Sequence, residues 1–232
     1  MLNRRQRSVV LDFGIPLLIF SALFLFIRYT NTDLVLSDLF YSSDGGWFLK
    51  RKQPWDLMYR FGGVPGLLLG AGALFCAVFG ARLKGTACAR KMALHFVLAL
   101  VVGQGLAVGA LKSAWKRPRP KEIRHYGGVE RFLRVGEVGT SRRHRSFPSS
   151  HATIAYYLIT PFFVLRRTRR GWAVCFLVVG ILYGTLMGVG RLAYGGHFAS
   201  DIVGSAALTY LTGLVLVYAL RLDQARVETA RS

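Results

Sequence analysis

Residues 172–220 read WAVCFLVVGILYGTLMGVGRLAYGGHFASDIVGSAALTYLTGLVLVYAL and contain two long apolar runs joined by a short polar segment. The runs Trp172–Val189 and Ile202–Leu220 are each long enough to cross a hydrocarbon core about 30 Å thick as a helix. The segment between them carries Arg191, His197 and Asp201. Charge this close to a membrane span is costly unless it has a partner, so the segment is a candidate functional site.

The same alternation of apolar runs and polar segments extends through the chain. The further predicted spans are Val9–Ile27, Phe61–Ala81, Met92–Leu111 and His151–Leu165. Hydrophobic residues make up 53% of the 232 residues and charged residues only 18%, whereas a soluble domain has about 25% charged residues. The sequence therefore predicts an all-α integral membrane protein of one domain, a six-helix bundle. Its core would be residues 61–220, preceded by a first span and an interfacial segment in residues 1–60.

Basic residues beside the spans predict the orientation. They form four clusters: Arg4 to Arg7, Arg82 to Lys91, Arg166 to Arg170 and Arg221 to Arg231. With six spans all four clusters fall on one side, which should be the cytoplasm because cytoplasmic loops collect Lys and Arg. Both termini are then expected in the cytoplasm.

The net charge of +20 would suggest a nucleic-acid partner in a soluble chain. The predicted spans exclude a soluble nucleic-acid binder, and no nucleic-acid partner is expected. The three cysteines, Cys76, Cys88 and Cys175, form no disulfide or zinc pattern. Neither a metal nor a cofactor is predicted, and the sequence leaves the oligomeric state open.

The opposite side holds three segments: Arg28–Arg60, Lys112–Ser150 and Gly190–Asp201. The first has an amphipathic pattern and is expected to lie in the membrane interface. The second carries eleven Lys and Arg against three Glu, where the orientation rule predicts few positive charges. Such a loop indicates a function, unless it is only a solvated basic loop or the topology is wrong.

His197 and Asp201 are one helical turn apart if the last span begins near His197. The carboxylate could then accept a hydrogen bond from one imidazole nitrogen and leave the other free as a nucleophile. Gly195 and Gly196 let the backbone approach the site closely. An ordinary helix N-terminus with Asp in its first turn would explain Asp201 alone.

Two further clusters complete the candidate site. Pro148-Ser149-Ser150-His151 opens a span, where Ser is an ordinary N-cap but where helix amides and a hydroxyl also bind anions. His151 would be placed to protonate a leaving alkoxide. Lys112 and Arg119 would supply fixed positive charge to phosphoryl oxygens, although Lys112 alone also fits a snorkelling lysine.

The order Lys-x6-Arg-Pro, Pro-Ser-x-His and Arg-x5-His-x3-Asp is similar to the type 2 phosphatidic acid phosphatase superfamily, over roughly Phe61 to Leu220. The resemblance implies a metal-independent phosphatase without a cofactor that forms a phosphohistidine. It implies His197 as the nucleophile, Asp201 as the residue that orients it and His151 as the general acid. The implied phosphate-binding residues are Lys112, Arg119, Ser149, Ser150 and Arg191.

Two positions depart from the family pattern. Gly190 stands where a serine usually precedes Arg191, and Ser150 stands where the second motif usually has glycine. One phosphate-binding hydroxyl is therefore missing, and Ser150 is a candidate to replace it from another direction. Neither departure affects the proposed nucleophile, its carboxylate or the acid.

A site at the membrane boundary indicates a lipid phosphate, and the basic loop favours a polyanionic headgroup. Residues 33–41 with 46–48 resemble a segment of bacterial members related to lipid A phosphatases. The preferred hypothesis is dephosphorylation of lipid A, or a similar anionic lipid, on the outer face of a bacterial inner membrane. The alternatives are an undecaprenyl-pyrophosphate or phosphatidylglycerol-phosphate phosphatase, a lipid phosphotransferase, and a non-enzymatic protein that binds anionic lipids.

Overall fold

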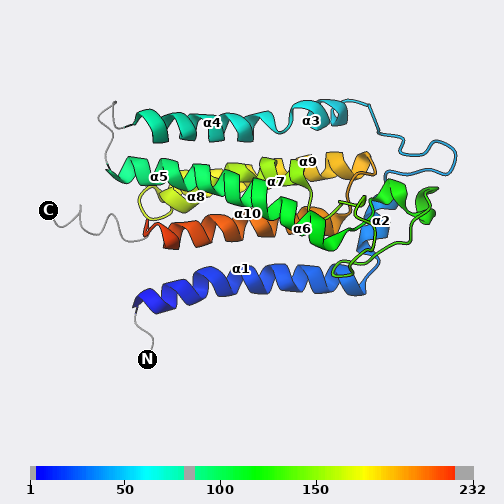
Figure 1. Cartoon of the computed structure of the whole chain (residues 1–232), viewed down its shortest axis with the longest axis horizontal. Coiled ribbons are helices and arrows are strands. Elements are labelled where there is room, and N and C mark those ends of the chain that lie inside the picture. The colour runs from blue at the N-terminus through cyan, green and yellow to red at the C-terminus, as the bar shows by residue number, and fades with distance from the viewer. Residues whose placement is uncertain (1–3, 81–86, 223–232) are drawn as a thin grey trace.

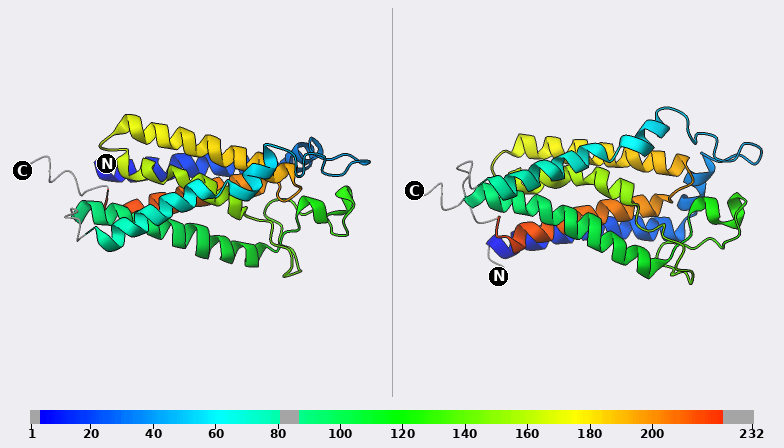
Figure 2. Two further views of the ribbon diagram at one scale, coloured as in Figure 1. Left: turned by 90° about the horizontal axis from the view of Figure 1, so that it is seen from above. Right: turned by 45° about the horizontal axis from the view of Figure 1, so that its top comes forward.

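The structure is a computed structural model that describes residues 4–80 and 87–222. Within these residues it consists of helices and loops without a strand. The long helices lie side by side along one axis (Figure 1), and the two further views show the same bundle (Figure 2). The predicted helical class is confirmed.

The bundle is made of six helical rods. They are α1 (Arg4–Tyr29); α3 (Trp55–Phe61) with α4 (Val64–Phe79); α5 (Ala87–Leu98), η1 (Ala99–Ala107) and α6 (Val108–Trp115); α7 (Ser150–Tyr156), η4 (Tyr157–Ile159) and α8 (Thr160–Leu165); α9 (Arg170–Ala193); and α10 (Ala199–Ala219). Short helices α2 (Thr32–Asp38), η2 (Pro120–Glu122) and η3 (Arg124–Tyr126) lie in the connecting segments.

Five of the rods are long and apolar enough to span a membrane, and the rod Ser150–Leu165 is shorter. Most residues of this shorter rod are buried, because α9 and α10 pack against it. The 3₁₀ turn η4 interrupts it just before Pro161, where the sequence predicts a kink. Five of the six predicted spans therefore have full spanning length in the described residues, and the predicted count of six spans stays a prediction.

Small residues bring the helices together. On α9, a Cβ added at Gly184 would overlap the Tyr156 ring, and one at Gly188 would overlap Ile202. Glycine at these positions therefore lets α9 lie directly against α7 and α10. On the outer surface, large apolar side chains such as Leu18, Leu68 and Leu182 are exposed, as expected for helices that face lipid.

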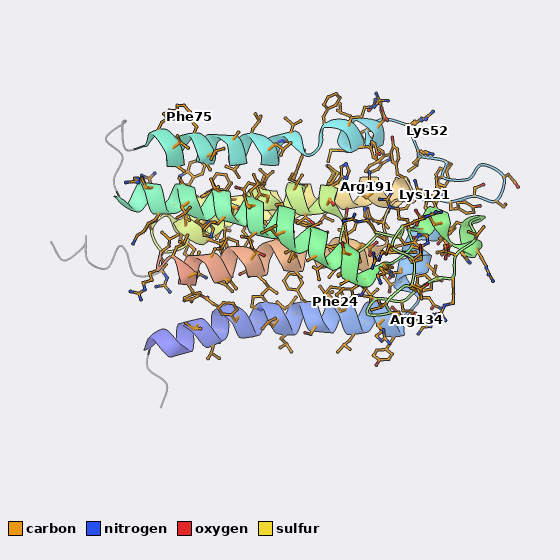
Figure 3. The ribbon with its side chains drawn as sticks, viewed as in Figure 1. Phe24, Lys52, Phe75, Lys121, Arg134 and Arg191 are labelled. Atoms are coloured by element: carbon orange, nitrogen blue, oxygen red, sulfur yellow. The ribbon has the colours of Figure 1, made fainter. Side chains whose placement is uncertain are left out.

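The connecting segments at one end of the bundle form a polar cap. The segment between α1 and α3, the loop between α6 and α7 and the turn between α9 and α10 all meet there (Figure 1). Figure 3 shows Lys52, Lys121, Arg134 and Arg191 at this end, and Phe24 and Phe75 along the helices. The helix ends next to the predicted basic clusters, at the start of α1, between α4 and α5, between α8 and α9 and after α10, lie at the opposite end of the bundle (Figure 1). Arg82, Lys84, Arg226 and Arg231 lie outside the described residues.

The segment Arg28–Arg60 packs against other parts of the polar cap, and its placement in the membrane interface stays a prediction. Its side chains Leu34, Tyr41 and Trp47 pack onto Ile123 and Phe198 in one apolar cluster. The apolar side chains of this segment therefore pack against the rest of the polar cap. The sequence pattern shows that such a face exists but does not identify its partner.

Candidate active site

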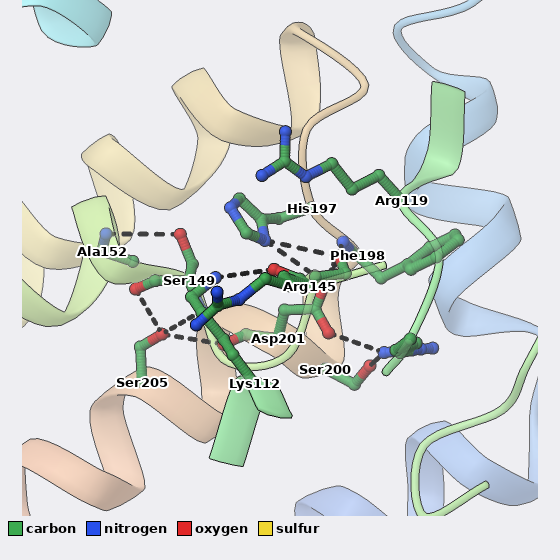
Figure 4. Close-up of polar contacts among 12 residues, drawn as sticks. Lys112, Arg119, Arg145, Ser149, Ala152, His197, Phe198, Ser200, Asp201 and Ser205 are labelled. Carbon is green, nitrogen blue, oxygen red and sulfur yellow. Dashed lines mark hydrogen bonds and ion pairs between the residues drawn. The ribbon is translucent and has the colours of Figure 1, made fainter. Parts of the chain in front are cut away.

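The three motif clusters meet beneath the polar cap (Figure 4). His197 lies in the turn between α9 and α10, and Asp201 lies in the first turn of α10. Arg191 comes from the last turn of α9, and Lys112 from the last turn of α6. The apolar runs end at the same level in the bundle, so residues far apart in the sequence gather around His197.

His197 and Asp201 form the centre of the site. Nδ1 of His197 lies 3.5 Å from Oδ2 of Asp201, which also accepts a hydrogen bond from the backbone N–H of Phe198 at 2.9 Å. His197 is almost fully buried. Burial lowers the pKa of His197 to about 3, Asp201 opposes this shift, and the positive charges of Arg191 and Lys112 add to it. The imidazole is therefore neutral near pH 7, with Nδ1 facing the carboxylate and Nε2 free to attack.

Two residues outside the motif positions hold Asp201. Arg117 is fully buried and donates from Nη1 to Oδ1 of Asp201 at 2.8 Å. Ser146 donates from Oγ to Oδ2 at 2.6 Å, and the same Oγ lies 3.5 Å from His197 Nδ1. Sequence reasoning missed both residues, because Arg117 looks like one more cation of the basic loop. One charge of that loop is thus a buried partner of Asp201.

The cations around His197 have little to neutralise them. Arg191 is 5% exposed, and its Nε and Nη1 have no hydrogen-bond partner among the described residues. Its guanidinium lies 4.6 Å from the centre of the Tyr59 ring. Lys112 donates from Nζ to the backbone carbonyl of Arg145 at 2.7 Å. Buried donors without partners, held next to other cations, suit an anion with several oxygens.

The second motif occupies the start of α7. Ser149 is buried, and its Oγ accepts a hydrogen bond from the backbone N–H of Ala152 at 3.4 Å, so it caps the helix. Ser150 is exposed and has no side-chain hydrogen bond among the described residues. His151 is partly buried, and its ring stacks on Tyr59 at 5.6 Å. A phosphate-binding role for either serine stays a prediction.

A cleft of about 430 Å³ opens beside the site in the polar cap. Six basic side chains line it: Lys50, Arg51, Arg60, Arg119, Lys121 and Arg191. Among the described residues that line the cleft, Asp56 is the one carboxylate, and it already pairs with Arg60 at 2.8 Å and accepts from the Tyr194 hydroxyl at 2.7 Å. The cleft is therefore strongly positive. No group of three or more His, Cys, Asp or Glu in the described part of the chain could hold a metal ion.

One protein family and several known proteins are similar to this chain. Residues 92–224 match the model of the PAP2 superfamily. A lipid A 4'-phosphatase of Francisella tularensis subsp. novicida is 27% identical over 211 residues, which cover 87% of this chain and 91% of that protein. A lipid A 4'-phosphatase of Rhizobium leguminosarum is 33% identical over 124 residues, 52% of this chain and 50% of that protein. No solved structure matches the chain.

Proposed function

Because the chain belongs to the PAP2 superfamily, we propose that it is a membrane phosphatase that hydrolyses a phosphomonoester of lipid A or a closely similar anionic lipid. Residues 1–232 would act as one membrane domain. The observation that carries this proposal is the buried pair His197–Asp201 next to Arg191, whose guanidinium has donors without partners. A neutral nucleophile beside unpartnered cations suits attack on a phosphate monoester.

In the proposed first step, Nε2 of His197 attacks phosphorus while the bond from phosphorus to the lipid oxygen breaks. His151 protonates the leaving alkoxide. Nδ1 of His197 keeps its proton and faces Asp201, which stabilises the positive charge of the phosphorylated imidazole. In the second step water attacks phosphorus, His151 takes the proton of that water, and the bond from Nε2 to phosphorus breaks.

The cations supply the electrostatic part of the reaction. Arg191, Arg119 and Lys112 would bind the phosphoryl oxygens and stabilise the charge that spreads over them in the transition state. Ser149 and Ser150 would assist at the start of α7, where helix amides also attract an anion. The reaction needs no metal ion in this scheme, because cationic side chains bind the phosphate.

The relatives named lipid A 4'-phosphatase and the positive cleft support lipid A as the substrate. Its phosphorylated headgroup would enter the cleft, and its acyl chains would lie along the apolar outer surface of the bundle. The helix lengths suit a membrane protein. We place it in the bacterial inner membrane with the polar cap toward the periplasm and both termini in the cytoplasm, following the basic clusters at the other end.

Phosphate release by the detergent-purified protein tests the proposal. The panel comprises lipid A, undecaprenyl pyrophosphate and phosphatidylglycerol phosphate, each with EDTA present. We expect release from lipid A that survives EDTA and is abolished in His197→Ala. Mass spectrometry of the product identifies the position cleaved and any phosphate moved to an acceptor lipid. Turnover of another lipid while lipid A stays intact would refute the substrate, and full activity of His197→Ala would refute the mechanism.

A further inference from the structure

Asp33 is a buried carboxylate that the scheme above does not use. It lies in α2 of the polar cap and is 3% exposed. Its Oδ2 accepts hydrogen bonds from Arg117 Nη2 at 2.8 Å and from Ser200 Oγ at 2.7 Å. Its Oδ1 accepts the backbone N–H of Ser200 at 2.8 Å. Asp33 therefore contacts the two residues that lie on the far side of Asp201 from His197.

The contact with Ser200 fixes the start of α10. The residue before this helix is Phe198, whose side chain has no oxygen to accept the free N–H groups of the first turn. Asp33 supplies the missing acceptor from a segment 167 residues away. A carboxylate is also favoured there by the helix dipole. The position of Asp201, one residue further along the same turn, thus depends on Asp33.

The contact with Arg117 fixes a guanidinium between two carboxylates. Nη2 binds Asp33, while Nη1 binds Asp201 and also Ser200 Oγ at 2.6 Å. Nε donates to the carbonyl of Leu133 at 3.0 Å. The planar guanidinium can meet all of these acceptors in one orientation only. Two carboxylates and one guanidinium leave this buried group with one net negative charge.

We propose that Asp33 is a positioning residue for the reaction: through Arg117 and Ser200 it holds Asp201 against His197 and gives the buried group its net negative charge. This inference rests on the proposed function. When Nε2 of His197 carries the phosphoryl group and Nδ1 keeps its proton, the ring becomes cationic. Asp201 paired with Arg117 alone is neutral overall, so Asp33 supplies the charge that balances the cationic ring.

A positioning role predicts a specific kinetic pattern. Asp33 does not line the cleft, so its substitution should slow the chemical step and leave substrate binding unchanged. We expect Asp33→Asn to lower kcat for phosphate release from lipid A by about tenfold, with KM within about twofold. Less phosphoenzyme should accumulate in reactions quenched with alkaline detergent, in which phosphohistidine is stable, because the cationic intermediate loses its balancing charge.

Asp38→Asn is the matched control. Asp38 lies on the same helix and binds Tyr126 at 2.8 Å and His125 at 3.2 Å, which ties α2 to the loop without contact to Arg117. If α2 mattered only for packing of the cap, both variants would lose activity together with thermal stability. We expect Asp38→Asn to keep kcat within about twofold of the wild type.

Two further variants test the route through Arg117 and Ser200. In an Arg117→Gln background, Asp33→Asn should lower kcat by less than it does in the wild type, because only the contacts of Asp33 with Ser200 are then left to lose. Ser200→Ala keeps the backbone N–H but removes the hydroxyl that donates to Asp33 and accepts from Arg117, and it should lower kcat about threefold. This smaller change keeps the inference testable if Asp33→Asn does not fold.

The outcomes separate this inference from the proposed function. Wild-type hydrolysis of lipid A that is lost in His197→Ala supports the function whatever happens at Asp33. With that established, a kcat of Asp33→Asn equal to that of Asp38→Asn overturns the positioning role, as does a loss carried by KM alone. A wild type that releases no phosphate from any lipid of the panel refutes the proposed function, and the positioning role with it.

Discussion

Gly195 should be the position where a single methyl group damages both the fold and the reaction. It stands two residues before His197 with φ +60°, and a Cβ added there would overlap the indole of Trp47. Trp47 cannot easily move away, because it packs against Tyr41 and Tyr126 with ring centres at 5.4 and 5.0 Å. Gly195→Ala therefore places an alanine in the left-handed backbone conformation and also overpacks the contact with Trp47.

The structure offers a control for each part. Gly46 also has φ +60° but would place a Cβ in open space, so Gly46→Ala isolates the backbone cost of about 1–2 kcal/mol. The overlap with Trp47 adds about 1–3 kcal/mol. We expect Gly195→Ala to lower the free energy of unfolding by about 2–5 kcal/mol. Because His197 shifts with the turn, kcat should fall about a hundredfold.

The assay is thermal and denaturant unfolding of the detergent-purified variants, together with phosphate release. Trp47→Ala removes the overlapping ring, so the double variant with Gly195→Ala should be more stable than the two single effects predict, by about 1 kcal/mol or more. Gly195→Ala that is no less stable than Gly46→Ala would refute the account of this turn, as would strictly additive effects in the double variant.

Three shorter predictions concern charge and capping. The pKa of His197 is about 3 in the folded protein against 6.5 in the unfolded chain, so the unfolded chain binds the proton first as the pH drops. The free energy of unfolding should therefore fall by up to about 1.4 kcal/mol per pH unit between pH 6.5 and pH 3. Unfolding measured across this pH range should show a smaller slope in His197→Gln. Lys121→Ala should raise KM for a bisphosphorylated lipid A about threefold, whereas Lys52→Ala, outside the cleft, should leave KM unchanged. Ser149→Ala should cost about 1 kcal/mol of stability as a lost N-cap, and equal loss in the exposed Ser150→Ala would contradict that assignment.

Length and apolarity of the runs predict the helices well, because a membrane sets a minimum span. The same criterion overstates the rod Ser150–Leu165, which is sheltered by its neighbours and is shorter than the others. The amphipathic pattern of the segment Arg28–Arg60 indicates an apolar side, and Leu34, Tyr41 and Trp47 of this segment pack with Ile123 and Phe198. Periodicity shows which faces are apolar, but it does not tell lipid from protein as the partner.

The motif residues could be identified because each stands at the end of an apolar run. Arg117, Asp33 and Ser146 could not be. Arg117 is 84 residues from each of its two carboxylates, Asp33 and Asp201, and Ser146 is 55 residues from Asp201. No local spacing marks such pairs, and a buried arginine in a basic loop has the same sequence signature as a solvated one.

The polar cap also bears on how this protein can be divided. The match to the family model begins at residue 92, yet Asp33, Trp47 and Tyr59 reach the site from earlier in the chain. A fragment trimmed to the matched range would keep every motif but lose the residues from the first 60 positions that pack around the site. Transplanting the motif helices into another scaffold, or exchanging the first 60 residues between relatives, should therefore yield proteins with an intact signature and a collapsed site. The part of the chain that builds the active site is therefore longer than the part that carries the family motifs.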